Sequence, residues 1–372
     1  MLVIQQKKLN QLDKLSIELK NFIRNYYDKP EGNISLHEPI FIGNEKKYLS
    51  ECIDSTFVSS VGKYVTLFEQ KISEYTNTKN SIAVVNGTSA LHICLKLCGV
   101  KSGDEVITQS LTFVATANAI SYLNAKPIFI DVDIDTLGLS PISLNEFLNE
   151  FGEKRDNGTY NKKTGKKIAA CLPMHTFGFI CKIDEIIKIC NEWGIPVIED
   201  SAEALGSKYN DKSAGTFGKM SAISFNGNKI ITSGGGGIIL TNSNILAKKA
   251  KHITTTSKLP HKWEFDHDSV GYNYRMPNLN ASLVYAQIEQ IDNFILKKRE
   301  LHDQYQLLFD KYGIELIKPP KGNKWNYWLN SIRLSNRKER NLFLEKSHKH
   351  LILNRPIWKL LFRLNMYSSC QR

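Results

Sequence analysis

The sequence predicts an α/β fold built on a largely parallel central sheet. From about residue 45 to residue 240, short runs rich in Val and Ile alternate with stretches of helical periodicity. Consecutive parallel strands need a crossover connection, usually a helix, and strands covered on both faces are apolar throughout. The 372 residues, 42% of them apolar, are enough for about two folding units with sizeable cores.

Five strands are expected in this region, separated by helical stretches. They cover residues 81–85, 104–109, 126–133, 167–175 and 195–202. In parallel sheets with helices on both faces, ligands bind outside the carboxyl ends of the strands. The residues directly after each strand are therefore the first candidates for a functional site.

Three parts of the chain are expected. Residues 1–44 form an N-terminal helical segment, because leucines and a phenylalanine recur at helical spacing between Leu9 and Phe22. Residues 45–258 form a large domain. Residues 259–372 form a smaller α/β domain, because a polar and aromatic loop follows Lys258 and leads into a long helical stretch.

Composition and charge narrow the class of protein. The net charge of +12 comes from scattered lysines and arginines, so a nucleic-acid partner is not expected, whereas a polyanionic small substrate is compatible. The seven cysteines form no C-x-x-C pair, a pattern typical of a reduced, cytoplasmic protein. No stretch approaches the ~20 apolar residues of a membrane span, so no membrane partner is expected.

The stretch NGTSALH, residues 86–92, follows the first strand. Gly87 permits a tight turn, and Thr88 and Ser89 can cap the helix that begins there. Free N–H groups at a helix start, together with two hydroxyl groups, can bind a phosphate. A plain helix cap explains the same residues, so both interpretations stay open.

Asp200 ends the strand-forming run IPVIED, residues 195–200. A carboxylate at such a position is expected to have a partner, which can be a helix start, a metal ion or a cationic ring nitrogen. A metal site needs more ligands than Asp200 and His175, the one histidine that follows a neighbouring strand. No metal site is therefore expected.

Lys229 lies between the polar turn and the glycines of SFNGNKIITSGGGG, residues 224–237. A phosphate-binding helix start, an aspartate after a later strand and this lysine together suit pyridoxal phosphate. The lysine would hold the aldehyde, and Asp200 would keep the pyridine nitrogen protonated. Phe113, after the second strand, is available to stack on the ring, although core packing explains a single phenylalanine equally well.

Five motifs in order extend this hypothesis. They are NGTSALH, GDEVITQSLTFVATANAI, IPVIEDSAEALGS, SFNGNKIITSGGGG and GYNYRMPNLNASL. With them the sequence resembles, over nearly its whole length, the pyridoxal-phosphate-dependent nucleotide-sugar aminotransferases of the DegT/StrS type. The resemblance implies the aspartate-aminotransferase-like fold type I and a homodimer with active sites at the interface. It also implies that pyridoxal 5′-phosphate alternates with pyridoxamine 5′-phosphate.

The resemblance further implies roles for individual residues, with Lys229 and Asp200 as the catalytic pair. The implied cofactor contacts are Gly87, Thr88, Ser89, Phe113, Asp200, Glu203, Ser224 and Lys229, together with Asn273 of the partner subunit. The implied substrate contacts are Ser60, His175, Arg275, Arg355 and Trp358. Arg275 would meet the carboxylate of the amino donor. Glu203 stands where many members have Gln or His beside the cofactor's phenolic oxygen, so its pKa is expected to be raised.

The implied activity is transfer of the amino group of L-glutamate to the C4 ketone of a nucleotide-linked 4-keto-6-deoxy sugar. Two loop segments, residues 36–65 and residues 251–278, resemble those of the subgroup that aminates UDP-4-keto-6-deoxy-N-acetylhexosamines. This resemblance implies UDP-4-keto-6-deoxy-N-acetylglucosamine as the substrate, in the synthesis of bacterial surface glycans such as the O-antigen of lipopolysaccharide. A GDP- or dTDP-linked sugar and a non-catalytic regulator are the alternatives. Related 3-dehydratases carry histidine where this chain has Lys229, which argues against dehydration. The family normally continues for a few tens of residues past Arg372, so the small domain is expected to be incomplete.

Overall fold

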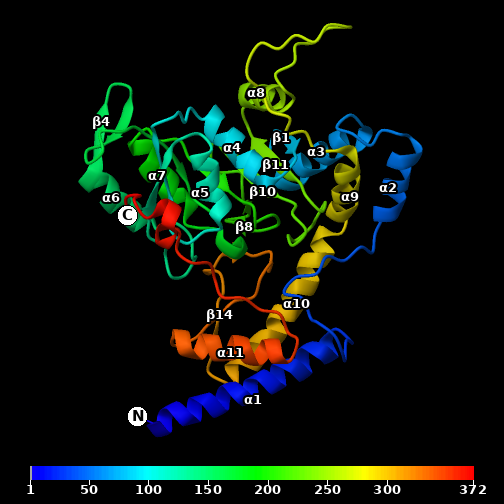
Figure 1. The fold of residues 1–372 in the computed structure, drawn as a ribbon, viewed down its shortest axis with the longest axis vertical. Helices are drawn as coiled ribbons and strands as arrows, with labels where there is room; N and C mark the ends of the chain where they lie inside the picture. The colour runs from blue at the N-terminus through cyan, green and yellow to red at the C-terminus, as the bar shows by residue number, and fades with distance from the viewer. Residues whose placement is uncertain (1) are drawn as a thin grey trace. The chain divides into compact units, whose positions relative to one another are not determined.

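The structure, a computed structural model, describes residues 2–372, with side chains from residue 11 onward, and the chain divides into two compact units (Figure 1). The small unit comprises residues 1–38, 297–318 and 329–358. The large unit comprises residues 39–296, 319–328 and 359–372.

The helices and strands follow one another in the α/β alternation that the sequence predicts. Those of the large unit are α2 (Glu45–Asp54), α3 (Lys63–Thr76), β1 (Asn80–Val84), α4 (Gly87–Leu97), β2 (Glu105–Gln109), α5 (Val114–Ser121), β3 (Lys126–Ile130), α6 (Pro141–Phe151), β4 (Gly152–Arg155), β5 (Gly158–Asn161), β6 (Ile168–Leu172), η1 (Thr176–Gly178), α7 (Ile183–Glu192), β7 (Ile198–Asp200), β8 (Lys208–Tyr209), β9 (Lys212–Ser213), β10 (Met220–Ser224), β11 (Gly237–Thr241), α8 (Asn244–Thr254), α9 (Asn278–Ile288), β13 (Asn323–Lys324), η2 (Leu361–Arg363) and η3 (Asn365–Tyr367). Those of the small unit are α1 (Leu2–Tyr26), β12 (Glu315–Leu316), β14 (Ile332–Arg333) and α11 (Arg337–Lys349), and α10 (Ile291–Asp310) contributes residues to both units.

The central sheet of the large unit is mostly parallel, as predicted. One hydrogen-bonded sheet has the order β3-β2-β6 and is parallel throughout. A second has the order β1-β11-β10-β7, in which β11 runs antiparallel to both neighbours. Parallel bridges from Cys171 to Val197 and from Met174 to Asp200 join β6 to β7. The carboxyl ends of β7 and β10, which carry Asp200 and Ser224, therefore lie at the same edge of the sheet.

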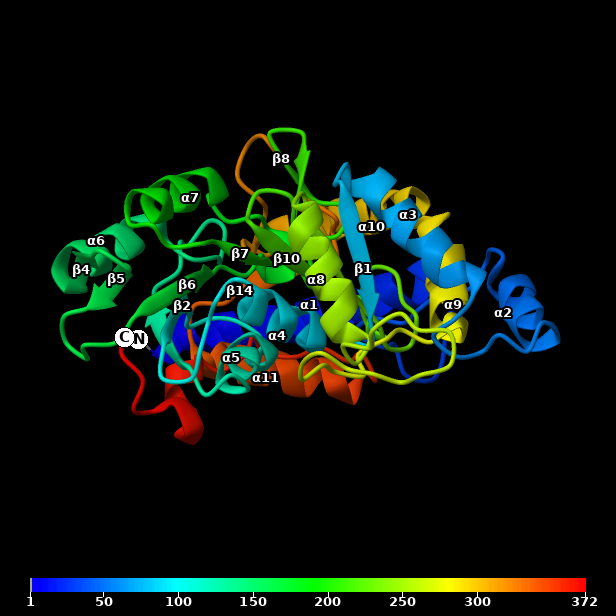
Figure 2. The same ribbon diagram turned by 90° about the horizontal axis from the view of Figure 1, so that it is seen from above.

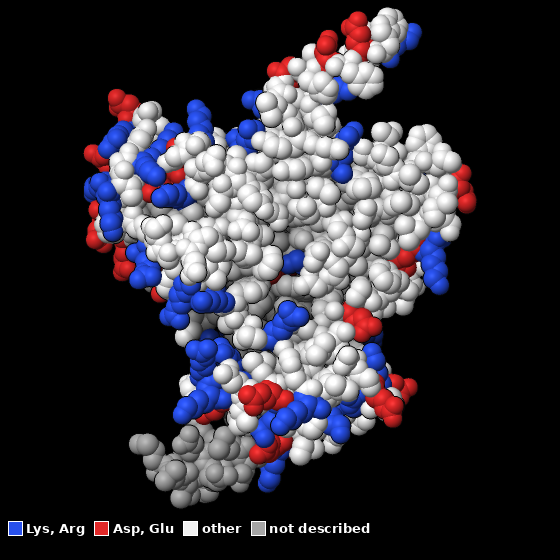
Figure 3. All heavy atoms as spheres, viewed as in Figure 1, with Lys and Arg blue, Asp and Glu red and all other residues white. Residues whose placement is uncertain are grey.

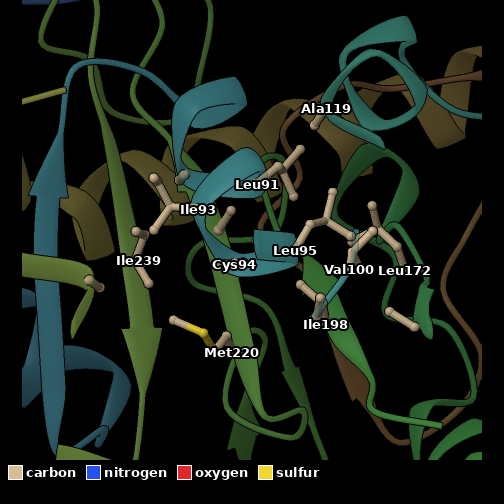
Figure 4. Packing of buried hydrophobic residues seen from close by; sticks show 14 of the residues in the cluster. Leu91, Ile93, Cys94, Leu95, Val100, Ala119, Leu172, Ile198, Met220 and Ile239 are labelled. Carbon is tan, nitrogen blue, oxygen red and sulfur yellow. The ribbon is translucent and has the colours of Figure 1, made fainter. Parts of the chain in front are cut away.

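Helices cover both faces of this sheet, with α6 and α7 on one face and α4 and α5 on the other (Figure 2). On the α4 face, Leu91, Leu95 and other apolar side chains of the helix pack against Met220 and Ile239 of the strands (Figure 4). On the opposite face the core contains Leu148 of α6 together with apolar residues of α7. Burial of apolar surface on both faces stabilises the sheet and keeps its carboxyl edge in place.

The observed division differs from the predicted boundary at residue 258. Residues 259–296 belong to the large unit, because α9 packs against α2 and α3. Residues 359–372 return to the large unit as well, where the amide of Phe129 donates to the carbonyl of Gln371. Leu361 and Tyr367 are buried there against Ala117 and Phe129. These contacts join segments distant in the sequence, which local composition does not reveal.

The N-terminal segment is helical as predicted, but it is part of the small unit rather than a separate piece. Leu12, Leu15, Leu19 and Ile23 of α1 are buried in a core that also contains Phe343 of α11. None of the helices within residues 2–372 combines the length and the apolar content that crossing a bilayer requires. Over the same described residues, no group of His, Cys, Asp and Glu side chains is arranged to hold a metal ion.

Candidate active site

Helix α4 begins directly after β1 and is capped by Asn86, not by the predicted Thr88 or Ser89. The Asn86 side chain accepts a hydrogen bond from the Ser89 amide at 2.7 Å. An asparagine in extended conformation is a strong N-cap, and the hydroxyl groups of Thr88 and Ser89 are then not needed for capping. The helix start therefore keeps two hydroxyl groups for an anion, as the phosphate interpretation requires.

Gly87 and Ser224 meet at this helix start. A Cβ atom added at Gly87 would lie 2.9 Å from the Ser224 Cβ and 3.3 Å from its hydroxyl oxygen. Such a contact is too close for any residue other than glycine without a shift of the backbone. The structure thus brings together the two parts of the predicted phosphate site, which are separated by more than a hundred residues in the sequence.

The glycine run after Lys229 also lets two backbone segments pack closely at the start of α4. Gly237 pairs with Val84 of β1 on one side and with Ser224 of β10 on the other. A Cβ atom at Gly237 would lie 2.4 Å from the carbonyl carbon and oxygen of Asn86. The absence of a side chain at Gly237 therefore allows β11 to pass directly beside the turn that starts α4.

Asp200 is buried at the end of β7, with both carboxylate oxygens bonded. One accepts from the Thr116 hydroxyl at 2.7 Å and the other from the Ala202 amide at 3.1 Å. Burial raises the pKa of Asp200, while these two hydrogen bonds and the charge of Lys229 act in the opposite direction. A buried carboxylate of this kind favours a cationic partner such as a protonated ring nitrogen. Sequence reasoning did not identify Thr116.

Lys229 and Glu203 form an ion pair beside Asp200. The Lys229 Nζ lies 3.4 Å from Glu203 Oε1 and 4.3 Å from the centre of the Trp328 ring. The other oxygen of Glu203 accepts from the Phe177 amide at 2.8 Å. Burial raises the pKa of Glu203 to about 7, although the charge of Lys229 lowers it in part. The raised pKa agrees with the expectation from the sequence.

His175 is fully buried and lies behind the site rather than on its surface. Because the Cys181 amide donates to Nδ1 at 3.4 Å, the proton of the ring is assigned to Nε2, which donates to Glu199 at 3.0 Å. Glu199 also accepts from three backbone amides of residues 215–218. In this arrangement His175 supports the backbone around Asp200 and presents no surface to a sugar, contrary to the substrate contact expected for it.

Two exposed residues, Asn273 and Arg275, lie on the segment that pairs with the end of β1. The Val85 amide donates to the Tyr274 carbonyl, so residues 273–275 run alongside that strand. The Arg275 side chain donates to the Asn273 side chain at 3.0 Å. Phe113, just before α5, is half-exposed. Each of these residues is accessible in the single chain, as a contact with cofactor, donor or partner subunit requires.

The remaining predicted substrate contacts are Ser60 of the large unit and two residues of the small unit. Ser60 lies on the turn before α3, and the neighbouring Ser59 carbonyl accepts from the Asn278 amide at 2.6 Å. Arg355 and Trp358 belong to the small unit. On the face of the molecule in Figure 3, Lys and Arg side chains are spread among acidic ones and form no continuous basic patch.

Comparison with known proteins agrees with this geometry. The sequence profile of the DegT/DnrJ/EryC1/StrS aminotransferase family matches residues 40–371. The GDP-perosamine synthase of Escherichia coli O157:H7 is 37% identical over 336 residues, which are 90% of this chain and 87% of that protein. The putative pyridoxal phosphate-dependent aminotransferase EpsN of Bacillus subtilis (strain 168) is 37% identical over 329 residues, 88% of this chain and 82% of that protein. Among solved structures, the aminotransferase TlmJ from Streptoalloteichus hindustanus superposes with a TM-score of 0.82 at 25% identity, over 92% of this chain and 89% of that one.

Proposed function

The chain belongs to the DegT/DnrJ/EryC1/StrS aminotransferase family, and we propose that it moves the amino group of L-glutamate to the C4 ketone of a GDP-linked 4-keto-6-deoxy sugar. It is a pyridoxal-phosphate-dependent sugar aminotransferase of fold type I. The similarity to a GDP-perosamine synthase supports GDP as the nucleotide over the UDP expected from the loop segments. The product would serve the synthesis of a bacterial surface glycan.

The convergence of Lys229, Asp200 and Ser224 at one edge of the sheet carries this proposal. Pyridoxal phosphate needs a phosphate site, an anion beside its ring nitrogen and an amine beside its aldehyde. The contact between Gly87 and Ser224 leaves a helix start free of side-chain bulk for the phosphate. Asp200 is the buried anion and Lys229 the amine. The residues present therefore fit the cofactor.

Further cofactor contacts in the proposal come from residues whose role rests on resemblance. Thr88 and Ser89 would add hydroxyl groups to the phosphate site, Phe113 would cover one face of the ring, and Glu203 would lie near the phenolic oxygen. Asn273 of the partner subunit would complete the phosphate site, which makes a homodimer the active form. When bound, the cofactor supplies an electron sink that stabilises negative charge on the carbon bearing the amino group.

Lys229 is the proton carrier of the proposed reaction. Its amine would take a proton from Cα of glutamate in the first half of the reaction and deliver one to C4 of the sugar in the second half. Asp200 stays anionic when a cationic nitrogen faces it, because its two hydrogen bonds and that charge oppose the effect of burial. Glu203 can hold a proton near neutral pH, so it need not add a second negative charge beside Lys229.

The substrate side of the proposal uses positive charge. A net charge of +12 favours the approach of a nucleoside diphosphate sugar. Arg275 would meet a carboxylate of glutamate, while Ser60, Arg355 and Trp358 stay candidates for the nucleotide sugar. Both substrates are cytoplasmic metabolites, so we place the reaction in the cytoplasm.

The test is an absorbance spectrum of the purified protein loaded with pyridoxal phosphate. L-glutamate should remove the visible band, and a GDP-linked 4-keto-6-deoxyhexose should restore it, whereas UDP-4-keto-6-deoxy-N-acetylglucosamine should restore it far more slowly. The variant Lys229→Ala, the matched control, should show no such cycle. Restoration by the UDP sugar alone would overturn the choice of nucleotide, and a wild-type spectrum that ignores glutamate would overturn the assignment of the activity.

A further inference from the structure

Lys229 has an aromatic neighbour as well as an acidic one. The Trp328 side chain is buried, and the centre of its ring lies 4.3 Å from the Lys229 Nζ. Glu203 Oε1 lies 3.4 Å from the same nitrogen. The Lys229 side chain is itself only 12% exposed. Its ammonium group is therefore held by a carboxylate and by the face of an indole, with little access to water.

The indole is fixed in this position by hydrogen bonds at both ends of the residue. Its ring N–H donates to the Asn228 carbonyl at 2.6 Å, one residue before Lys229. The Trp328 amide donates to the Asn326 side chain at 3.1 Å. Trp328 is thus tied directly to the backbone that carries the lysine, and its ring cannot turn away without loss of this partly buried hydrogen bond.

Asn326 ties the same indole to Glu203. Its fully buried side-chain amide donates to the carbonyls of Glu203 at 2.7 Å and Leu205 at 3.0 Å. One side chain therefore holds the backbone of the acidic neighbour and the backbone of the aromatic neighbour at once. The two partners of the Lys229 ammonium form a single bonded unit, which is a stronger argument for positioning than either contact alone.

We propose that Trp328 is a positioning residue for Lys229 and that its indole face holds the lysine as an ammonium group beside Glu203 whenever the amine is free. This inference rests on the role of Lys229 in the proposed function. An aromatic face attracts a cation most strongly when the pair is shielded from water, as this one is. A cation–π contact of this kind changes an equilibrium that depends on the cation by roughly tenfold.

The consequence for the reaction concerns the interval in which Lys229 holds a proton that it has taken from one substrate. A charged amine held between Glu203 and Trp328 stays in one place until it delivers that proton. Asp200 is a further charged group near the lysine, and the charge of Lys229 acts to lower the pKa of the Asp200 carboxyl. Trp328 differs from both acids because its effect does not depend on its own protonation.

The experiment compares Trp328→Phe with Trp328→Leu in the cofactor-free protein. Phe keeps an aromatic face but loses the bond to Asn228, whereas Leu loses both. Lys229 is acetylated with a trace of acetic anhydride between pH 7 and pH 11, and its labelling is read by peptide mass spectrometry against exposed Lys249 as internal standard. The pH at which labelling of Lys229 is half-maximal reports on protonation of the amine. Access of the reagent to the amine changes only the labelling rate reached at high pH.

We expect the Lys229 midpoint to move about one pH unit lower in Trp328→Leu, which corresponds to the tenfold effect, and to stay near the wild-type value in Trp328→Phe. Equal midpoints in wild type and Trp328→Leu would overturn the proposal. Equal shifts in both variants would also overturn it, since the bond to Asn228 would then be responsible. If Trp328→Leu does not fold, Trp328→Met fills a similar volume without a ring. A failure of the proposed function would show separately, in the spectrum of the wild-type protein.

Discussion

Replacing Glu203 with glutamine tests the electrostatics of the site without its cofactor. Glu203 is buried, with one oxygen at the Phe177 amide and the other near Lys229. Glutamine has nearly the same shape and keeps an acceptor for the Phe177 amide, but it cannot ionise. The substitution therefore removes the charged form of the side chain and changes little else.

The size of the effect follows from the pKa. Burial raises the pKa of Glu203 from 4.5 to about 7, net of the opposing charge of Lys229. Because the pKa of Glu203 is higher in the folded than in the unfolded state, the stability that Glu203 contributes is fully present below pH 4.5. This contribution is lost as the pH rises through about 7. The total loss corresponds to about 3 kcal/mol. Because Glu203→Gln escapes this loss, the variant should match the wild type near pH 4 and exceed it by up to about 3 kcal/mol at pH 8.5.

The free energy of unfolding in urea, measured on the cofactor-free proteins at several pH values, gives this difference directly. The exposed Glu146→Gln variant is the control and should differ from the wild type by a constant and small amount across the range. A difference between Glu203→Gln and wild type that does not change with pH would refute the reasoning. A wild type that gains on the variant as the pH rises would show that the ion pair with Lys229 outweighs burial.

Three further predictions concern the sheet edge and the small unit. Gly237→Ala should cost about 1–3 kcal/mol of stability, because the new methyl group would meet the Asn86 carbonyl. The same variant should bind pyridoxal phosphate more weakly in a spectroscopic titration. Gly235→Ala is the control and should bind the cofactor normally, since its added atom would have nothing within 4 Å. Leu15→Ala should cost about 2–5 kcal/mol in urea unfolding, since Leu15 is fully buried in the core of the small unit; a loss under about 0.5 kcal/mol, the value expected at an exposed helix position, would contradict this packing. Asp200→Asn should still bind pyridoxal phosphate but lower kcat by about a hundredfold or more, and unchanged turnover would exclude Asp200 from catalysis.

The sequence was sufficient to predict five strands of the sheet and Asp200 at its edge, but not β10 and β11. Alternation of apolar runs and helices predicted parallel strands, and parallel strands present the residues that follow them at one edge. Asp200 was found in this way, because it ends a predicted strand, whereas β10 was not among the five expected strands and Ser224 was identified through the family resemblance. Lys229, in the loop after β10, followed from its place between Ser224 and the glycines.

The partners of these residues could not be predicted, because they come from distant parts of the chain. Thr116 bonds to Asp200 across 84 positions, and Asn326 bonds to the Glu203 carbonyl across 123. Neither residue stands in a local pattern that marks it. Helical and strand periodicity reports which face of an element is buried but not what packs against it. The same limit explains the misplaced boundary at residue 258.

Gly237 explains why the proposed phosphate site and the lysine keep a fixed relation to each other. It lies between the last residues of two strands, Val84 and Ser224, and touches the Asn86 peptide that begins the helix. Lys229 lies in the loop that leaves Ser224 and returns at Gly237. Both ends of that loop are therefore anchored by backbone pairing beside the helix start, and the distance from the lysine to the proposed phosphate site is set mainly by the sheet. Side-chain bulk at position 237 would push β11 away from the helix and move both halves of the site at once.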